Sequence, residues 1–173
     1  METVSLPHLP DYPLHICLFK DVNNAPFLRQ QLLEGNTDFE YAFLDASILL
    51  SRNQVLAACF RAINDLLQDR LKSRNVHSEI VFSLSPNNNI SESFRRFGVA
   101  ETSRHILAVK VGGVQSQIEQ HLKGSVEGNL VPLTDEQFAE LRDESRLRKV
   151  YKIGATGNEA EAFVIGSMAL KGS

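Results

Sequence analysis

The sequence has few cysteines and no long apolar run, and each shortage excludes a class of protein. Cys17 and Cys59 are the only two cysteines in 173 residues, which is typical of reduced core residues in an intracellular protein rather than of a disulfide framework. No apolar run approaches the roughly 18 residues that span a bilayer. The stretch 1–10 lacks the basic and apolar regions of a secretory signal. We therefore expect neither a membrane protein nor a secreted one.

The sequence also lacks the motifs of the common catalytic sites. It contains no Walker A sequence, no dinucleotide-binding glycine fingerprint and no G-x-S-x-G elbow. Gly112-Gly113 lies where a phosphate could bind, but a tight turn explains two such glycines more simply. His15 and Cys17 share one strand face without a second pair of zinc ligands, and His77 and His105 are expected in capping or surface positions. The sequence thus predicts no catalytic residue, cofactor or metal, although a site assembled from distant positions stays open.

Composition and charge are those of an ordinary globular chain. Hydrophobic residues make up 43% and charged residues 23% of the sequence, and the net charge is −3. Diffuse attraction for nucleic acid or an anionic membrane is therefore excluded, and such binding would need a local basic patch. Without a repeat, a low-complexity tract or a linker, residues 1–173 are predicted to form one domain.

Apolar runs between turn-forming residues predict an interleaved series of strands and helices. The expected strands are 14–19, 39–44, 80–84, 104–111 and 126–133. The expected helices are 25–35, a long one from Ser51, 90–97, 114–124, 135–151 and 158–170. Several connections are too short for parallel crossovers, so we expect an α+β fold: a mostly antiparallel or mixed sheet of four to five strands packed with helices.

Capping signals mark several of these helices. Ser51 with Gln54, and Thr134 with Gln137, have the spacing of a capping box. The far end of the long helix carries Arg70, Lys72 and Arg74. Cations there favour the negative end of the helix dipole, and a binding patch is the alternative explanation.

The stretch LSPNNNISESFRRFG, residues 84–98, forms a polar corner before a short helix. Asn89 is predicted to cap that helix, with Glu92 returning the bond from its third position. Asn87 and Asn88 tolerate the left-handed backbone of a sharp strand-to-helix turn. The exposed N–H groups of the helix also offer a potential anion site, so structure and ligand binding both remain open from local physics.

Three segments together resemble the PRPK-binding protein family, the kinase-binding subunit of the KEOPS or EKC complex. They are LFKDVNNA at 18–25, SEIVFSLSPNNNISESFRRFGV at 78–99 and RKVYKI at 148–153. The resemblance runs in order from about residue 4 to residue 170, and the Ser-Pro-Asn corner is its most distinctive part. The region 113–141 matches only in outline.

The resemblance implies a non-catalytic subunit. Family members bind the N-terminal lobe of the small atypical kinase of KEOPS, support its ATPase activity and meet the other subunits through it. The complex completes threonylcarbamoyladenosine in tRNA, and family members are associated with capturing the tRNA acceptor end. The resemblance further implies a location in nucleus and cytoplasm, and telomere maintenance and transcription are linked to the whole complex in some organisms.

The last predicted helix supplies candidates for the kinase interface. Its apolar arc is wider than a surface helix normally needs, although a deeply packed terminal helix would explain the same arc. The candidates are Phe163, Val164, Met168 and Leu170.

Two basic groups are candidates for tRNA contacts, with a solvated helix face as the alternative in each case. The first is Arg146, Arg148, Lys149 and Lys152, beside Tyr151 as an exposed aromatic on which a base could stack. The second is Arg95 and Arg96 on the helix after the asparagines, where Phe94 and Phe97 are expected in the core.

A function of another class remains open beside the accessory subunit. A free-standing anion-binding protein or small-molecule enzyme could use the corner at Asn87–Asn89.

Overall fold

The computed structural model describes residues 1–154 and 158–171. Five strands form one sheet: β1 (Glu2–Val4), β2 (Leu14–Lys20), β3 (Ala42–Asp45), β4 (Ile106–Val111) and β5 (Asn129–Val131). The α-helices of the described residues are α1 (Ala25–Leu33), α2 (Arg52–Leu67), α3 (Val76–Leu84), α4 (Ile90–Phe97), α5 (Gln115–Ser125), α6 (Asp135–Leu141), α7 (Glu144–Tyr151) and α8 (Asn158–Leu170). Short 3₁₀ turns occupy Thr37–Phe39 and Ala46–Ile48. The predicted α+β class is confirmed.

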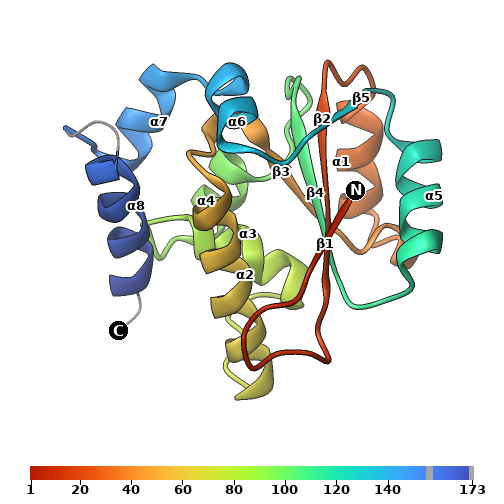
Figure 1. The fold of residues 1–173 in the computed structure, drawn as a ribbon, viewed down its shortest axis with the longest axis horizontal. Coiled ribbons are helices and arrows are strands. Elements are labelled where there is room, and N and C mark those ends of the chain that lie inside the picture. Colours follow the sequence, from red (N-terminus) through yellow and green to blue (C-terminus); the bar gives the residue numbers. More distant parts are fainter. Residues whose placement is uncertain (155–157, 172–173) are drawn as a thin grey trace.

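The sheet is antiparallel and lies between two layers of helices. Its order is β1-β2-β4-β3, with β5 also paired to β2, so β3 is a terminal strand. Along β2, Ile16 faces one buried cluster and Cys17 faces the other. Figure 1 shows α1 and α5 on one side of the sheet and the remaining helices on the other. Both faces of the central strands are therefore core, as their continuous apolar runs require.

The predicted strand at 80–84 is wrong, because these residues belong to helix α3. The Asn75 side chain accepts from the backbone N–H of Ser78 at 2.9 Å, and the Ser78 hydroxyl accepts from the N–H of Asn75 at 3.0 Å. This reciprocal capping box starts the helix. The helix then packs against α2 and β3, and this burial explains why its sequence is apolar nearly all round.

The predicted helix 135–151 is also wrong in extent, because it is two helices. Asp143 interrupts it: its Oδ1 accepts from the N–H of Arg146 at 3.1 Å, and its own N–H donates to the carbonyl of Ser47 at 2.7 Å. The caps at Ser51 and Thr134 do accept from the N–H three residues on, at 3.2 Å each. Gln54, however, accepts from the N–H of Leu50 instead of completing a box.

Both cysteines lie in the core as free thiols. Burial raises the pKa of Cys17 to about 11 and that of Cys59 to about 12, so both thiols stay protonated at neutral pH. Across the described ranges, no helix has the length and apolar character needed to cross a membrane.

Candidate functional site

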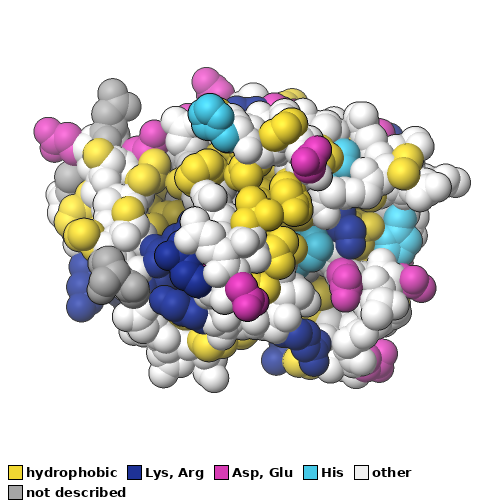
Figure 2. Space-filling view, turned by 90° about the horizontal axis from the view of Figure 1, so that it is seen from below, with side chains coloured by type: hydrophobic (Ala, Val, Ile, Leu, Met, Phe, Trp, Pro, Cys, Tyr) yellow, Lys and Arg dark blue, Asp and Glu magenta, His cyan; other side chains and the backbone are white. Residues whose placement is uncertain are grey.

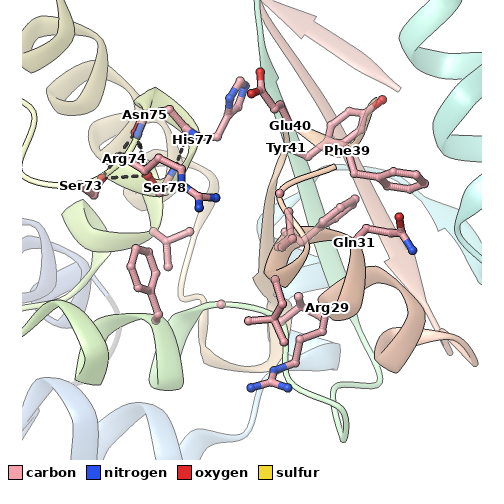
Figure 3. Close-up of a pocket in the computed structure, with 18 of the residues that line it drawn as sticks. Arg29, Gln31, Phe39, Glu40, Tyr41, Ser73, Arg74, Asn75, His77 and Ser78 are labelled. Atoms are coloured by element: carbon pink, nitrogen blue, oxygen red, sulfur yellow. Dashed lines mark hydrogen bonds between the residues drawn. The ribbon is translucent and has the colours of Figure 1, made fainter. Parts of the chain in front are cut away.

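A cleft of about 660 Å³ opens at the edge of the sheet beside β3. On one side it is bounded by α1 and the 3₁₀ turn after it, and on the other by α3 and α4 (Figure 3). The two walls belong to the two helix layers, which separate where the sheet ends. Its apolar lining is Leu32, Leu33, Phe39, Phe43, Val81, Ile90, Phe94 and Val99. The cleft thus combines apolar and aromatic side chains with polar ones in its lining.

Three arginines stand along this cleft. Arg29 comes from α1, Arg74 from the loop before α3, and Arg95 from α4. Nη1 of Arg74 lies 3.7 Å from the place that a Cβ on Gly35 would take, so this side chain reaches across toward the end of α1. Glu40 is the one acidic residue of the lining. The lining of the cleft therefore has more positive than negative side chains, although the chain as a whole is acidic.

The positive charge on one face of the molecule lies in groups. Figure 2, a view from below, shows Lys and Arg side chains gathered in separate groups on this face. Arg29 is paired with Glu101 at 3.7 Å, and Arg95 with Glu92, but both acids lie outside the lining of the cleft. Local attraction for an anion is thus compatible with the net charge of −3.

His77 and Tyr41 line the cleft and are both nearly buried. His77 is buried in the first turn of α3, so of the capping and surface positions expected for it the surface position is wrong. Its Nε2 accepts from the backbone N–H of Val111 at 3.0 Å, and burial, reinforced by nearby Lys110, lowers its pKa to about 3. The Tyr41 hydroxyl is 2.7 Å from Nδ1 of His121, and burial raises its pKa to about 12. Both groups are uncharged at neutral pH.

The asparagine corner joins two helices, α3 and α4, rather than a strand and a helix. Asn89 stands at the N-cap of α4, where its Oδ1 accepts from the N–H of Glu92 at 3.0 Å. Oδ1 of Asn87 accepts from the N–H of Asn89 at 2.6 Å. The left-handed backbone expected of Asn87 and Asn88 is absent; among the described non-glycine residues it occurs at four positions elsewhere. The side chains of Asn87 and Asn89 are therefore used within the turn.

Glu92 does not return a bond to the cap. Its carboxylate pairs with Arg95 and with Nε of Arg96 at 3.0 Å. The hydrogen bond from Arg95 is the main cause that holds the pKa of Glu92 below its ordinary value. Phe97 is fully buried, as expected, and Phe94 is half-buried beside the cleft.

Helix α8 divides the four candidates for the kinase interface into two pairs. Val164 and Met168 are buried in the main core cluster. Phe163 is 47% exposed and Leu170 is 77% exposed. The helix packs against α2, where Arg61 donates to the carbonyls of Met168 and Lys171. Packing of the terminal helix against the core explains Val164 and Met168, whereas Phe163 and Leu170 remain at the surface.

The basic candidates on α7 have different surroundings. Arg146 donates to Oδ2 of Asp45 at 3.3 Å and to the carbonyl of Arg96 at 3.2 Å, so its guanidinium is directed into the protein. Nε of Arg148 is 3.8 Å from a carboxylate oxygen of Glu144.

The remaining residues near the end of α7 contrast sharply in exposure. Lys149 and Lys152 are exposed. Tyr151 is not the exposed aromatic that the sequence suggested: it is buried, accepts from Gln54 at 2.7 Å and donates to the carbonyl of Leu84 at 2.5 Å.

Most residues of the cleft belong to no pattern that the sequence alone reveals. Arg74 is predicted from the sequence to lie at the end of the long helix, but α2 ends at Leu67, so Arg74 lies in the following loop. Arg29 and Tyr41 carried no motif, and only the fold brings them near α3. Among the described residues, no group of three His, Cys, Asp or Glu side chains is placed to hold a metal ion.

Comparison with known proteins identifies the family. A family model described as "Kinase binding protein CGI-121" matches residues 19–172. The "EKC/KEOPS complex subunit cgi121" of Aspergillus fumigatus is 52% identical over 184 residues, covering 100% of this chain and 97% of the relative. The Schizosaccharomyces pombe subunit of the same name is 35% identical, over 96% of this chain and 98% of the relative. The resemblance indicated by the sequence motifs is confirmed, and the chain belongs to the CGI-121 family of kinase-binding proteins.

Proposed function

We propose that this chain is the accessory subunit of an EKC/KEOPS-type complex that binds its small atypical kinase and supports the kinase's ATP hydrolysis. In this role it also helps to recruit tRNA for threonylcarbamoyladenosine modification. The observation that carries the proposal is the match of residues 19–172 to a kinase-binding family. The names of relatives that align with nearly the whole chain support the complex.

The exposed flank of α8 is our candidate for the kinase interface. Phe163 and Leu170 are seven residues apart, two helical turns, so they project from the same side of the helix. Val164 and Met168 hold that helix against the core, which presents the exposed pair on a fixed support. Exposed apolar side chains on a rigid element are typical anchors of a protein interface.

The cleft is our candidate for the tRNA acceptor end. That end is single-stranded, and proteins hold single strands by stacking bases on aromatic walls and by placing cations near phosphates. The cleft offers Phe39 and Phe94 in its walls and Arg74 and Arg95 along its sides. Arg148, Lys149 and Lys152 stay candidates for the tRNA body, whereas the inward bonds of Arg146 suit a structural role.

Two further parts of the proposal concern the location of the chain in the cell and the alternative function as an anion-binding protein. We place the chain in the nucleus and the cytoplasm with its complex, where any contribution to telomeres or transcription would be that of the whole assembly. An independent anion site at Asn87–Asn89 has less support, because Oδ1 of Asn87 and of Asn89 accept N–H groups of their own turn.

Charge insertion on α8 tests the kinase interface. Phe163→Glu and Leu170→Glu should each weaken binding of the purified kinase by at least about 2 kcal/mol, roughly 30-fold, as expected for an interface anchor. Val114→Glu is the matched control, since Val114 is 55% exposed before α5, far from α8 in Figure 1. Titration calorimetry gives the affinities, and circular dichroism checks the fold. Folded variants that bind like the control would exclude this face.

Charge reversal at the cleft tests the acceptor end. Arg74→Glu and Arg95→Glu should weaken binding of intact tRNA and lower its salt dependence by roughly 0.7 in log–log slope per lost phosphate contact. They should have little effect on tRNA trimmed of its single-stranded 3′ nucleotides. Lys123→Glu on α5, another exposed cation, should leave both affinities unchanged. Equal effects of the cleft variants on intact and trimmed tRNA would place the acceptor end elsewhere.

A further inference from the structure

His77 has an unusual position in the lining of the cleft. It is only 7% exposed, yet it belongs to the lining of the cavity. Its Nε2 accepts a hydrogen bond from the N–H of Val111 at 3.0 Å. A ring nitrogen that accepts from an N–H carries no proton, so in the neutral ring the proton is on Nδ1. The contact with β4 therefore fixes the tautomer of His77.

The surroundings also keep this ring neutral. Burial and the nearby ammonium of Lys110 disfavour the imidazolium, in agreement with the pKa of about 3. Lys110 itself is directed to the carbonyl of Glu40 at 2.7 Å and lies over the ring of Tyr41. His77 is thus a donor through Nδ1 alone at any physiological pH, and it cannot accept there.

No described residue supplies an acceptor for this Nδ1–H: the one hydrogen bond of the ring is that made by Nε2. Figure 3 shows the imidazole projecting from α3 toward the side of the cleft that carries Glu40 and Tyr41. Among the described residues, the buried side-chain polar atom without a partner is Oε1 of Gln137 and not this Nδ1, so the Nδ1–H reaches solvent and an acceptor on a ligand can replace water there. The bond from Val111 to Nε2 holds the planar ring in place, and with it the Nδ1–H.

We propose that His77 is a specificity-determining residue of the cleft and donates from Nδ1 to an acceptor atom on a base bound there. The inference rests on the proposed function of the cleft as the site of the tRNA acceptor end. A fixed donor pairs with a ring nitrogen or a carbonyl oxygen of a base and rejects an amino group at the same place. Phe39, Phe43 and Tyr41 line the same space and suit a flat ring.

Two substitutions distinguish the role of Nδ1 from that of Nε2. His77→Gln places an acceptor near the position of Nε2 and removes the donor at Nδ1. His77→Asn keeps an N–H donor attached at Cγ, as Nδ1 is, and loses the acceptor for Val111. The first variant tests recognition, and the second tests the structural tie of α3 to β4.

The probes are a four-nucleotide RNA ending in CCA and the same RNA with an abasic 3′-terminal nucleotide. His77→Gln should bind the complete RNA about tenfold more weakly than the parent, the effect of one hydrogen bond, and the abasic RNA equally well. His77→Asn should keep the parent affinity for the complete RNA while unfolding at a lower temperature. Long-range ¹H–¹⁵N spectra of the parent should show the Nδ1–H tautomer and a shift of that nitrogen on addition of the complete RNA.

Each contrary result has a different meaning. If His77→Gln binds both RNAs like the parent, or the parent shows the Nε2–H tautomer, His77 has no role in recognition while the cleft assignment stands. If the parent binds neither RNA, the acceptor-end site itself is refuted, and with it the role of His77.

Discussion

Nη1 of Arg146 on α7 lies 3.3 Å from Oδ2 of Asp45 at the end of β3. The same carboxylate accepts from the hydroxyl of Ser103 at 3.0 Å and from the N–H of Ser47 at 3.0 Å. Asp45 is 5% exposed, so these partners compensate a nearly buried charge. The ion pair ties a helix of the C-terminal region to the sheet, and this is why Arg146 is better explained as a structural residue.

Arg146→Ala should therefore lower the free energy of unfolding by about 1–3 kcal/mol, less than a fully buried pair because the arginine side chain is partly exposed. Urea denaturation measures the loss. Lys149→Ala, at an exposed position of the same helix, should change stability by less than about 0.5 kcal/mol. A neutral Arg146→Ala variant with reduced tRNA affinity would return Arg146 to the nucleic-acid surface.

Tyr151→Phe should destabilise the chain by about 1–3 kcal/mol, because the amide of Gln54 and the carbonyl of Leu84 would each lose a buried partner. Tyr12→Phe is a control at a half-buried position whose hydroxyl makes no hydrogen bond within the described residues. It should stay within about 0.5 kcal/mol of the parent. Chemical denaturation of both variants checks this, and equal stabilities would contradict the buried network.

Asn89→Ala should lower stability by about 1 kcal/mol through loss of the N-cap of α4. Asn88→Ala, at the neighbouring exposed position, should have little effect. Affinities for kinase and tRNA should stay unchanged in both variants. A stable Asn89→Ala variant that had lost either partner would make the corner a contact site instead.

His77 should make stability depend on pH in the acid range. Its pKa is about 3 in the folded chain against 6.5 for the ordinary group, so between these values the unfolded chain binds more protons. The stability from the neutral ring is complete above pH 6.5 and falls as pH drops toward 3, by at most about 1.4 kcal/mol per pH unit.

Replacement of His77 by Gln removes this titrating group. The difference in unfolding free energy between parent and His77→Gln should change steadily in favour of the variant from pH 7 to pH 4. Lys110 and Glu40 lie near the ring and are present in both proteins, so they cancel in this comparison. A difference independent of pH would mean that His77 titrates normally in the folded chain.

The sequence predicted the elements whose ends and faces are locally determined. The strand β2 can be predicted from its apolar run, and the cap at Asn89 from capping chemistry. Both lie where they were expected. The run at 80–84 failed because a short apolar segment fits a buried helix as well as a strand. The Asn75–Ser78 capping box decides in favour of the helix.

The site was harder to predict because it depends on tertiary structure. The walls of the cleft come from α1, the region before β3, α3 and α4, and no local pattern relates Arg29 to Arg74. The prediction of side-chain exposure failed for the same reason. Tyr151 lies among several cations in the sequence and was expected at the surface, but the packing of α7 buries it. Residue type alone also could not separate Phe163 from Met168 on one apolar helix.

ATP hydrolysis by the purified kinase, with and without this chain, tests the central claim of a non-catalytic kinase-binding subunit most directly. We predict no hydrolysis by the chain alone and a higher rate for the kinase on addition of the parent chain or the Val114→Glu control. Folded Phe163→Glu at the same concentration should give a much smaller increase. A kinase rate that the parent chain leaves unchanged, or hydrolysis by the chain alone, would contradict the account.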